Sequence, residues 1–227
     1  MRSSRLVTAL RYGVATALSL LFLLPFYVIV RNAFSTNQNI NAPRWSWLPD
    51  QLNLANLDSM LSSDSTGVLK GLLNSAIMTI LQTVGTVVVS LMAGYGLARF
   101  THRLSRMVLG LTVFTLMVPT TTTFIPMFII TSQFGWIDSF RGLVIPGMFS
   151  AFATYLFRQA FLDFPSELED AALMDGCNPF TAFWRIVVPN STGTVAAVGT
   201  IVLIGSWNAF LWPSLVGREA TRTVQVA

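Results

Sequence analysis

The stretch Pro165-Ser-Glu-Leu-Glu-Asp-Ala-Ala-Leu-Met-Asp-Gly176 holds four of the ten acidic residues of a strongly apolar chain. The proline or serine at its start can open a helix, and Glu167, Glu169 and Asp170 place negative charge in the first turn, where the helix dipole favours it. Charged side chains are costly within lipid, so this segment is expected at the membrane surface. It predicts a short surface helix.

The end of this helix is also marked. Gly176 is the natural left-handed stop and Pro179 prevents the same helix from continuing, so a second short helix is expected after a sharp corner. A small apolar patch is predicted on one face of the first helix, from Leu168, Ala171, Ala172 and Met174. Such a helix is suited to sit in a groove of another protein and to transmit force. The alternative is a surface helix that packs only on its own chain.

The rest of the chain has the composition of a membrane protein. Hydrophobic residues make up 53% of the 227 residues and charged residues only 11%, against about 25% charged in an average soluble domain. A spanning helix needs about 20 mostly apolar residues, and in lipid each span must satisfy its own backbone groups. Five helical spans are therefore predicted from the charge-free runs 12–30, 71–98, 107–137, 142–157 and 186–217.

The first run follows three arginines, so a cleaved signal peptide is an alternative to a span. The residues after it, Arg31-Asn32-Ala33-Phe34, lack the small-x-small cleavage pattern, which favours an anchored helix.

Basic residues indicate the orientation. With the N-terminus inside, eight Lys and Arg residues lie on the cytoplasmic side and six outside, and three of the eight crowd into the short loop Arg99–Arg106, where the positive-inside rule is most reliable. This orientation predicts a cytoplasmic N-terminus (1–11), a transmembrane domain (12–217) with an outer segment (32–69) and a cytoplasmic loop (163–189), and an outer loop (218–227). The odd number of spans suggests that a last helix is missing.

Several function classes are disfavoured. The single Cys177 and the single His102 give no cysteine cluster for zinc and no cofactor site, and arginines scattered between apolar runs do not form a nucleic-acid surface. The only lysine, Lys70, does not belong to a phosphate-binding G-x-x-x-x-G-K-[ST] loop, so the chain is not predicted to bind and hydrolyse ATP itself. No catalytic residue and no metal ligand is predicted.

Polar residues within the spans are candidates for a translocation path. Their hydroxyls and amides can exchange hydrogen bonds with a polar solute, although such residues more often bond one helix to another. Pro119 and Pro126 flank a threonine run in the third span and are expected to bend it. The candidate path residues are Asn74, Gln82, Thr120, Thr121 and Asn208.

The cytoplasmic loop resembles the EAA motif of ABC importer permeases. The pattern E-A-A, three residues, G, nine residues, I-x-L-P is present here as Asp170-Ala171-Ala172, Gly176 and Ile186-x-Val188-Pro189. All spacings agree, while Asp170 replaces Glu and Val188 replaces Leu. Maltose-type permease subunits are also similar at Asn74-Ser75, at Ala93-Gly-Tyr-Gly-Leu-Ala-Arg99 and at Trp207-Asn208-Ala-Phe-Leu-Trp212-Pro213.

This resemblance implies an all-α polytopic helical bundle of the ABC importer permease type, in the bacterial cytoplasmic membrane. It implies a non-catalytic subunit of a sugar importer, with a dimer of ATP-binding subunits, a second permease, an extracytoplasmic sugar-binding protein and membrane lipid as partners. Family members have six helices, so the sixth is expected beyond this sequence. A stand-alone secondary carrier or channel is the alternative, and an intramembrane hydrolase ranks last. The predicted ATPase-coupling residues are Glu167, Glu169, Asp170, Ala171, Ala172, Asp175, Gly176, Ile186 and Pro189.

Overall fold

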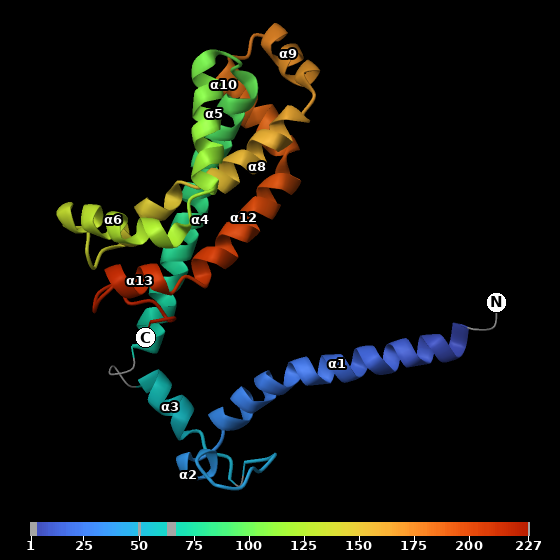
Figure 1. Ribbon diagram of the computed structural model, residues 1–227, viewed down its shortest axis with the longest axis vertical. Helices are drawn as coiled ribbons and strands as arrows, with labels where there is room; N and C mark the ends of the chain where they lie inside the picture. The colour runs from blue at the N-terminus through green and yellow to red at the C-terminus, as the bar shows by residue number, and fades with distance from the viewer. Residues whose placement is uncertain (1–3, 50, 63–66, 227) are drawn as a thin grey trace. The chain divides into compact units, whose positions relative to one another are not determined.

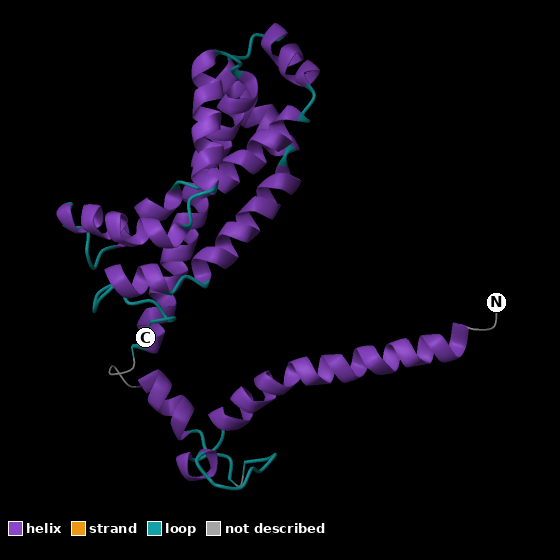
Figure 2. Ribbon diagram, viewed as in Figure 1, coloured by secondary structure: helices purple, strands orange, loops and turns teal. Residues whose placement is uncertain are grey.

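The computed structural model describes residues 4–49, 51–62 and 67–226, and within them every regular element is a helix (Figures 1 and 2). Arg2 and Ala227, which belong to the predicted terminal segments, lie outside the described residues. The chain divides into two compact units, Met1–Gly67 and Val68–Ala227. The boundary separates the first predicted span and most of the outer segment from the other spans.

The first unit consists of one long helix followed by two short ones. Helix α1 covers Ser4–Ala33, α2 covers Asn37–Ile40 and α3 covers Ala55–Ser62. Within α1, Val7–Ala33 is long and apolar enough to cross a membrane. The first charge-free run is therefore a continuous helix, as predicted.

The outer segment of this unit folds around Arg31. This side chain is only 4% exposed and donates hydrogen bonds to the side chains of Asn32, Asn39 and Ser46. Its guanidinium carbon lies 5.0 Å from the centre of the Trp45 ring, at a distance that allows a cation–π interaction. The segment thus forms a folded cap on the end of α1.

The second unit is built around α4, which covers Val68–Arg99. Its 32 residues give a length of about 48 Å, enough to cross a bilayer. Helices α8 (Ala151–Leu162) and α12 (Thr192–Trp207) pack along it (Figure 1). The main hydrophobic cluster joins these helices to the segment before α12, through Leu91, Ala98, Ala153, Phe157, Phe161, Phe183, Val187 and Val198.

The remaining spans are bent rather than straight. Helices α5 (Arg103–Leu116) and α6 (Thr120–Gln133) meet at 106°. The helix is interrupted before Pro119, because proline lacks the N–H needed to continue a helix and its ring blocks the preceding turn. The bend was predicted, but the structure shows a break. Pro126 lies inside α6.

Two further pairs of helical segments are also bent at a short break. Phe140–Met148, made of α7 (Phe140–Val144) and η1 (Ile145–Met148), meets α8 at 42°. Pro179–Asn190 meets α12 at 79° and consists of α10 (Pro179–Ala182), the π-helix η2 (Phe183–Val187) and α11 (Val188–Asn190).

The fifth charge-free run therefore begins within a broken helix, and it ends in the separate short helix α13 (Leu211–Val216). By length and composition the described residues hold two spans, or up to five if each bent pair counts as one. The latter number is the one predicted from the charge-free runs.

The C-terminal segment folds back onto the second unit through Asp138. The Asp138 carboxylate accepts hydrogen bonds from the backbone N–H groups of Arg218 (2.9 Å), Ala220 (3.1 Å) and Thr221 (3.0 Å). Burial opposes ionisation, but these bonds, with one from the Thr221 hydroxyl, outweigh it and lower the pKa of Asp138 to about 2. Asp138 acts as a clamp on the segment that follows α13.

Asp138→Asn is expected to lower the free energy of unfolding by about 1–2 kcal/mol at pH 7, because charge-assisted bonds are lost. Since the folded-state pKa lies below the ordinary value of 3.8, the wild-type stabilisation is present above about pH 4 and is lost as the pH falls toward 2. Thermal denaturation in detergent at several pH values measures both effects. The exposed Asp163 provides the control Asp163→Asn, and an equal loss in both variants would refute the clamp.

Candidate functional site

Helix α9 covers Ser166–Met174 and lies at one end of the second unit (Figure 1). It starts directly after Pro165, as predicted. Gly176 has a φ of +86°, and the N–H of Cys177 donates to the carbonyl oxygen of Ala172 at 3.0 Å, which closes the last turn. The predicted left-handed stop is confirmed. Asn178 then caps α10, so a corner separates two short helices.

The two faces of α9 differ in exposure. Glu169 and Ala172 are buried, at 7% and 5% exposure. Leu168, Leu173 and Met174 are exposed, and Met174 reaches 88%. The predicted apolar patch was wrong in its membership: Ala172 packs inward, because it lies three residues from Glu169 and so shares its face. Leu173 takes a place on the outer surface.

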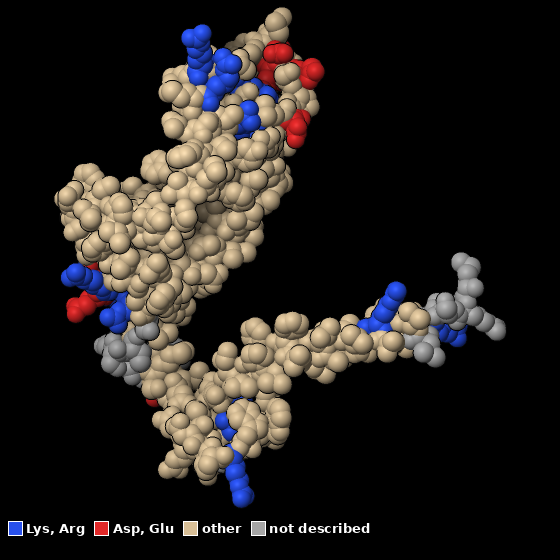
Figure 3. Space-filling model, in the orientation of Figure 1, with Lys and Arg blue, Asp and Glu red and all other residues tan. Residues whose placement is uncertain are grey.

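Three carboxylates accompany these apolar side chains. Glu167, Asp170 and Asp175 are exposed, as is Ala171 between them. Figure 3 shows acidic side chains gathered on the end of the second unit that carries α9. The outer surface of α9 therefore offers apolar contacts bordered by negative charge, which suits a partner groove with a basic edge.

Glu169 is the acidic residue of α9 that points inward. One carboxylate oxygen accepts a hydrogen bond from Arg99 Nε at 2.9 Å, and the other accepts one from the Tyr95 hydroxyl at 2.6 Å. Arg99 Nη2 also bonds Glu169, and it donates to the carbonyl oxygen of Phe164 at 3.3 Å. Glu169 thus ties α9 to the last turn of α4.

Tyr95 and Arg99 were not predicted as site residues. They are four residues apart on α4, so they share one face, and both lie in the stretch that resembles maltose-type permeases. That stretch could have drawn attention to them. Their partner on α9 is 70 or more residues away, and no spacing rule joins the two.

Two predicted coupling residues lie beyond the corner. Ile186 is part of η2, where it is half-buried, and Pro189 is an exposed residue of α11. Both belong to the bent segment that leads into α12. Val187, which directly follows Ile186, is fully buried in the main cluster. The structure therefore places them at the base of the loop, apart from the outer surface of α9.

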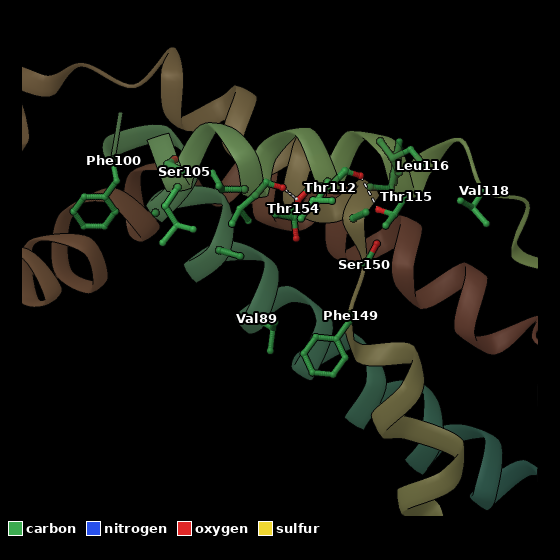
Figure 4. A pocket seen from close by; sticks show the side chains of 18 of the residues that line it. Val89, Phe100, Ser105, Thr112, Thr115, Leu116, Val118, Phe149, Ser150 and Thr154 are labelled. Atoms are coloured by element: carbon green, nitrogen blue, oxygen red, sulfur yellow. Dashed lines mark hydrogen bonds between the residues drawn. The ribbon is translucent and has the colours of Figure 1, made fainter. Parts of the chain in front are cut away.

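A groove of about 1080 Å³ lies between α4, α5 and α8. In Figure 4, Thr112 and Thr115 of α5 lie opposite Ser150 and Thr154 at the start of α8. Its surface is mostly apolar, and none of the described residues that line it is Asp, Glu, Lys or Arg. Seven hydroxyls interrupt this surface, from Ser105, Thr112, Thr115, Thr120, Thr123, Ser150 and Thr154.

The predicted path residues divide into two groups. Thr120 lines the groove, whereas Thr121 is exposed outside it. Asn74 donates to the carbonyl oxygens of Ala220 (3.1 Å) and Arg222 (2.9 Å) in the C-terminal segment.

The other two amides also bond within the chain. Gln82 accepts from the Ser206 hydroxyl at 3.0 Å, which joins α4 to α12, and Asn208 bonds the carbonyl of Ile204 in its own helix. For Asn74 and Gln82, the structure therefore shows the bonding between segments that was the alternative to a path. The groove hydroxyls of α5 and α8 were missed, because isolated Ser and Thr residues in apolar runs give no distinctive pattern.

Comparison with known proteins places this architecture in a family. Residues 85–226 match the family model described as binding-protein-dependent transport system inner membrane component. The chain is 35% identical over 213 residues to the sn-glycerol-3-phosphate transport system permease protein UgpE of Yersinia pestis bv. Antiqua (strain Antiqua), covering 92% of this chain and 75% of the relative. The UgpE protein of Escherichia coli O1:K1 / APEC is 32% identical over 209 residues, covering 90% and 74%.

A solved structure has the same fold. A chain from a bacterial ABC transporter involved in the import of the acidic polysaccharide alginate superimposes with a TM-score of 0.87 at 22% sequence identity, covering all of this chain and 80% of that one. The helical arrangement, the apolar spans and the family match agree with one another. This chain belongs to the family of binding-protein-dependent transport system inner membrane components and is a multi-pass permease subunit of an importer in the inner membrane.

Proposed function

We propose that this permease forms half of the translocation pathway of an ATP-driven importer for a sugar or a sugar-like polyol, and that α9 couples it to a separate ATPase dimer. The observation that carries this proposal is the outer surface of α9, where Leu168, Leu173 and Met174 are exposed beside three carboxylates. A helix that projects apolar side chains outside the lipid needs a protein partner to bury them.

The coupling surface is the exposed part of the predicted set. Glu167, Asp170, Ala171 and Asp175 surround the apolar side chains and would meet the edge of the ATPase groove. Closure of the ATPases can shift the permease between inward-facing and outward-facing packings only through contacts that differ between the two states. The corner at Gly176, between α9 and the bent helix that leads into α12, would convert such a displacement into movement of the spans.

The substrate class is supported by the groove and by the relatives. Hydroxyls on an otherwise apolar surface, with Phe100 and Phe149 among the lining residues, suit a sugar, whose polar groups need hydrogen bonds and whose ring faces pack on aromatic rings. The two relatives named above are permease proteins of sn-glycerol-3-phosphate transport systems. Because no Lys or Arg side chain lines the groove among the described residues, a phosphate would need counter-charge from elsewhere, for which the second permease is a source.

Reconstitution tests the proposal against a stand-alone carrier or channel. The tagged chain is purified in mild detergent with whatever remains bound, its partners are identified, and the complex is reconstituted with its binding protein. Uptake of radiolabelled maltose and of radiolabelled sn-glycerol 3-phosphate is then measured with and without ATP. The proposal predicts a second permease, an ATPase and ATP-dependent uptake of one probe. Uptake by the chain alone without nucleotide would establish the carrier or channel instead.

Met174→Glu is expected to remove most of the co-purifying ATPase, because it places a charge on the most exposed apolar side chain of α9. Loss of a central apolar contact in an interface costs about 2 kcal/mol or more, or roughly thirtyfold in affinity. The second permease should remain bound. Met117 is also highly exposed, at 78%, but it lies at the break between α5 and α6, so Met117→Glu is the matched control for the ATPase yield.

A further inference from the structure

The contact between α9 and α4 is the feature that the proposed coupling does not yet explain. If α9 sat in an ATPase groove, its outer surface would be held by the partner. Its inner surface must then pass the displacement to the spans. Helix α9 packs on α10 and η2, and the side chain of Glu169 joins it to α4 by hydrogen bonds.

The bonds to Glu169 fix its position from two sides. Arg99 Nε lies 2.9 Å from one carboxylate oxygen and 3.2 Å from the other, while the Tyr95 hydroxyl lies 2.6 Å from the second oxygen. Both donors come from one face in the last two turns of α4. Charge-assisted hydrogen bonds of this kind are stronger and more directional than neutral ones. They leave the carboxylate little freedom to rotate or slide.

Aromatic packing extends this cluster to two further elements. The Tyr95 ring lies 4.6 Å from the ring of Phe183 in η2 and 5.8 Å from the ring of Phe161 in α8, measured between centroids. Phe161 and Phe183 belong to the main hydrophobic cluster. Tyr95 therefore packs against the core on one side and bonds Glu169 on the other. A displacement of Glu169 would thus displace α4 together with its packing partners in α8 and η2.

We propose that Tyr95 and Arg99 are positioning residues for transport: they hold Glu169, and the Tyr95–Arg99–Glu169 cluster transmits the displacement of α9 to α4. The inference rests on the proposed coupling role of α9. It also gives Glu169 a different part from Glu167, Asp170 and Asp175, since Glu169 is buried against α4 and those three carboxylates are exposed. A buried ion pair is weak evidence for stability, because desolvation offsets the attraction, and fixed geometry is the better-supported consequence here.

The decisive measurement is the number of substrate molecules taken up per ATP hydrolysed in proteoliposomes that contain the complex and its binding protein. Glu169→Gln keeps the shape of the side chain but removes its charge. We expect ATP hydrolysis to remain and uptake per ATP to fall by about tenfold, within the usual range of coupling between sites. Loss of folded complexes alone would lower both rates and leave their ratio unchanged, so an unchanged ratio overturns the proposal.

Two variants protect the test from a folding failure. Tyr95→Phe removes one hydroxyl and is expected to lower the ratio by about two- to tenfold, the worth of one hydrogen bond. If the complex with Glu169→Gln does not assemble, the number of substrate molecules taken up per ATP by the Tyr95→Phe complex tests the proposal instead. Arg103→Gln, in the same basic loop but exposed and outside the cluster, is the matched control and should leave the ratio unchanged.

A second readout needs no transport and separates this inference from the proposed function. The single cysteine of the chain, Cys177, directly follows the end of α9 and can carry a nitroxide spin label in the full chain in lipid nanodiscs. Tyr95→Phe and Glu169→Gln should increase the mobility of the label, and Arg103→Gln should not. If the mobility rises but no ATP-dependent uptake exists in the wild type, the proposed function fails. If the mobility is the same in all variants, the cluster does not hold α9 and the inference fails.

Discussion

Gly94→Ala is expected to destabilise the second unit and to reduce the amount of chain found in the membrane. A methyl group at this position would lie 2.8 Å from Phe157 Cβ, 2.9 Å from the backbone nitrogen of Arg158 and 3.0 Å from the carbonyl oxygen of Thr154. Two of these three atoms belong to the backbone of α8, so they cannot move aside without displacing the helix. The change therefore forces α4 and α8 apart.

The size of this effect follows from two opposing terms. Alanine is the better helix former by about 1 kcal/mol, but overpacking of a close contact typically costs 1–3 kcal/mol. Here the cost is expected to exceed the gain, because α4 and α8 pack on each other extensively. Thermal unfolding in detergent should show a clear decrease in the midpoint temperature. Small residues allow membrane helices to approach closely, and this glycine is such a site.

Gly96→Ala is the matched control. It lies on the same helix two residues away, and a methyl group there would find only a ring atom of Phe100, at 3.8 Å. The gain in helix propensity is the same in both variants, so the difference between them isolates the contact with α8. Equal midpoint temperatures would show that α4 and α8 do not approach closely at Gly94.

Much of this fold was predictable because lipid imposes strict rules on a sequence. Charge-free runs of sufficient length located α1 and α4 closely, since a charge inside a span is costly. The start and stop of α9 were predicted by local chemistry at Ser166 and Gly176, where a first-turn charge and a left-handed glycine act within a few residues. The predictions of this start and stop were confirmed because both depend only on residues that are close in sequence.

The breaks in the spans and the direction of Glu169 were not predictable in the same way. Pro119 signalled a bend but not its angle of 106°, and the packing of α6 on α13 joins two helices that are far apart in sequence. The cytoplasmic loop 163–189 holds four other acidic residues, Asp163, Glu167, Asp170 and Asp175, and nothing in their spacing shows that Glu169 is the one that meets Arg99. An ion pair between residues 70 positions apart requires the three-dimensional structure.

Gly176→Val is expected to uncouple ATP hydrolysis from uptake. At a φ of +86° a side chain is strained, and valine, branched at Cβ, tolerates this conformation worst. A Cβ added there would meet no atom within 4 Å, so the effect comes from the backbone and not from a clash. The strain should open the corner between α9 and α10 and turn the outer surface of α9 away from its partner.

Gly176→Val is expected to lower substrate uptake strongly and to change the amount of chain in the membrane little. Strain of about 1–3 kcal/mol at one residue corresponds to a shift of roughly 5- to 150-fold between two arrangements of the corner. Uptake should fall within this range while the chain reaches the membrane at a normal level, because the core clusters lie away from Gly176. Uptake and ATP hydrolysis are measured in the same reconstituted vesicles.

Two further substitutions show whether the corner itself is responsible. Gly135 also has a positive φ, +67°, and open space around its Cβ position, but it lies in the turn after α6, so Gly135→Val applies similar strain away from α9 and should keep hydrolysis and uptake coupled. Gly176→Asn should retain most uptake, because asparagine adopts the left-handed conformation more readily than valine. Undiminished uptake by Gly176→Val at normal membrane levels would show that the corner after α9 does not transmit the movement, and the coupling role of this loop would then have to be abandoned.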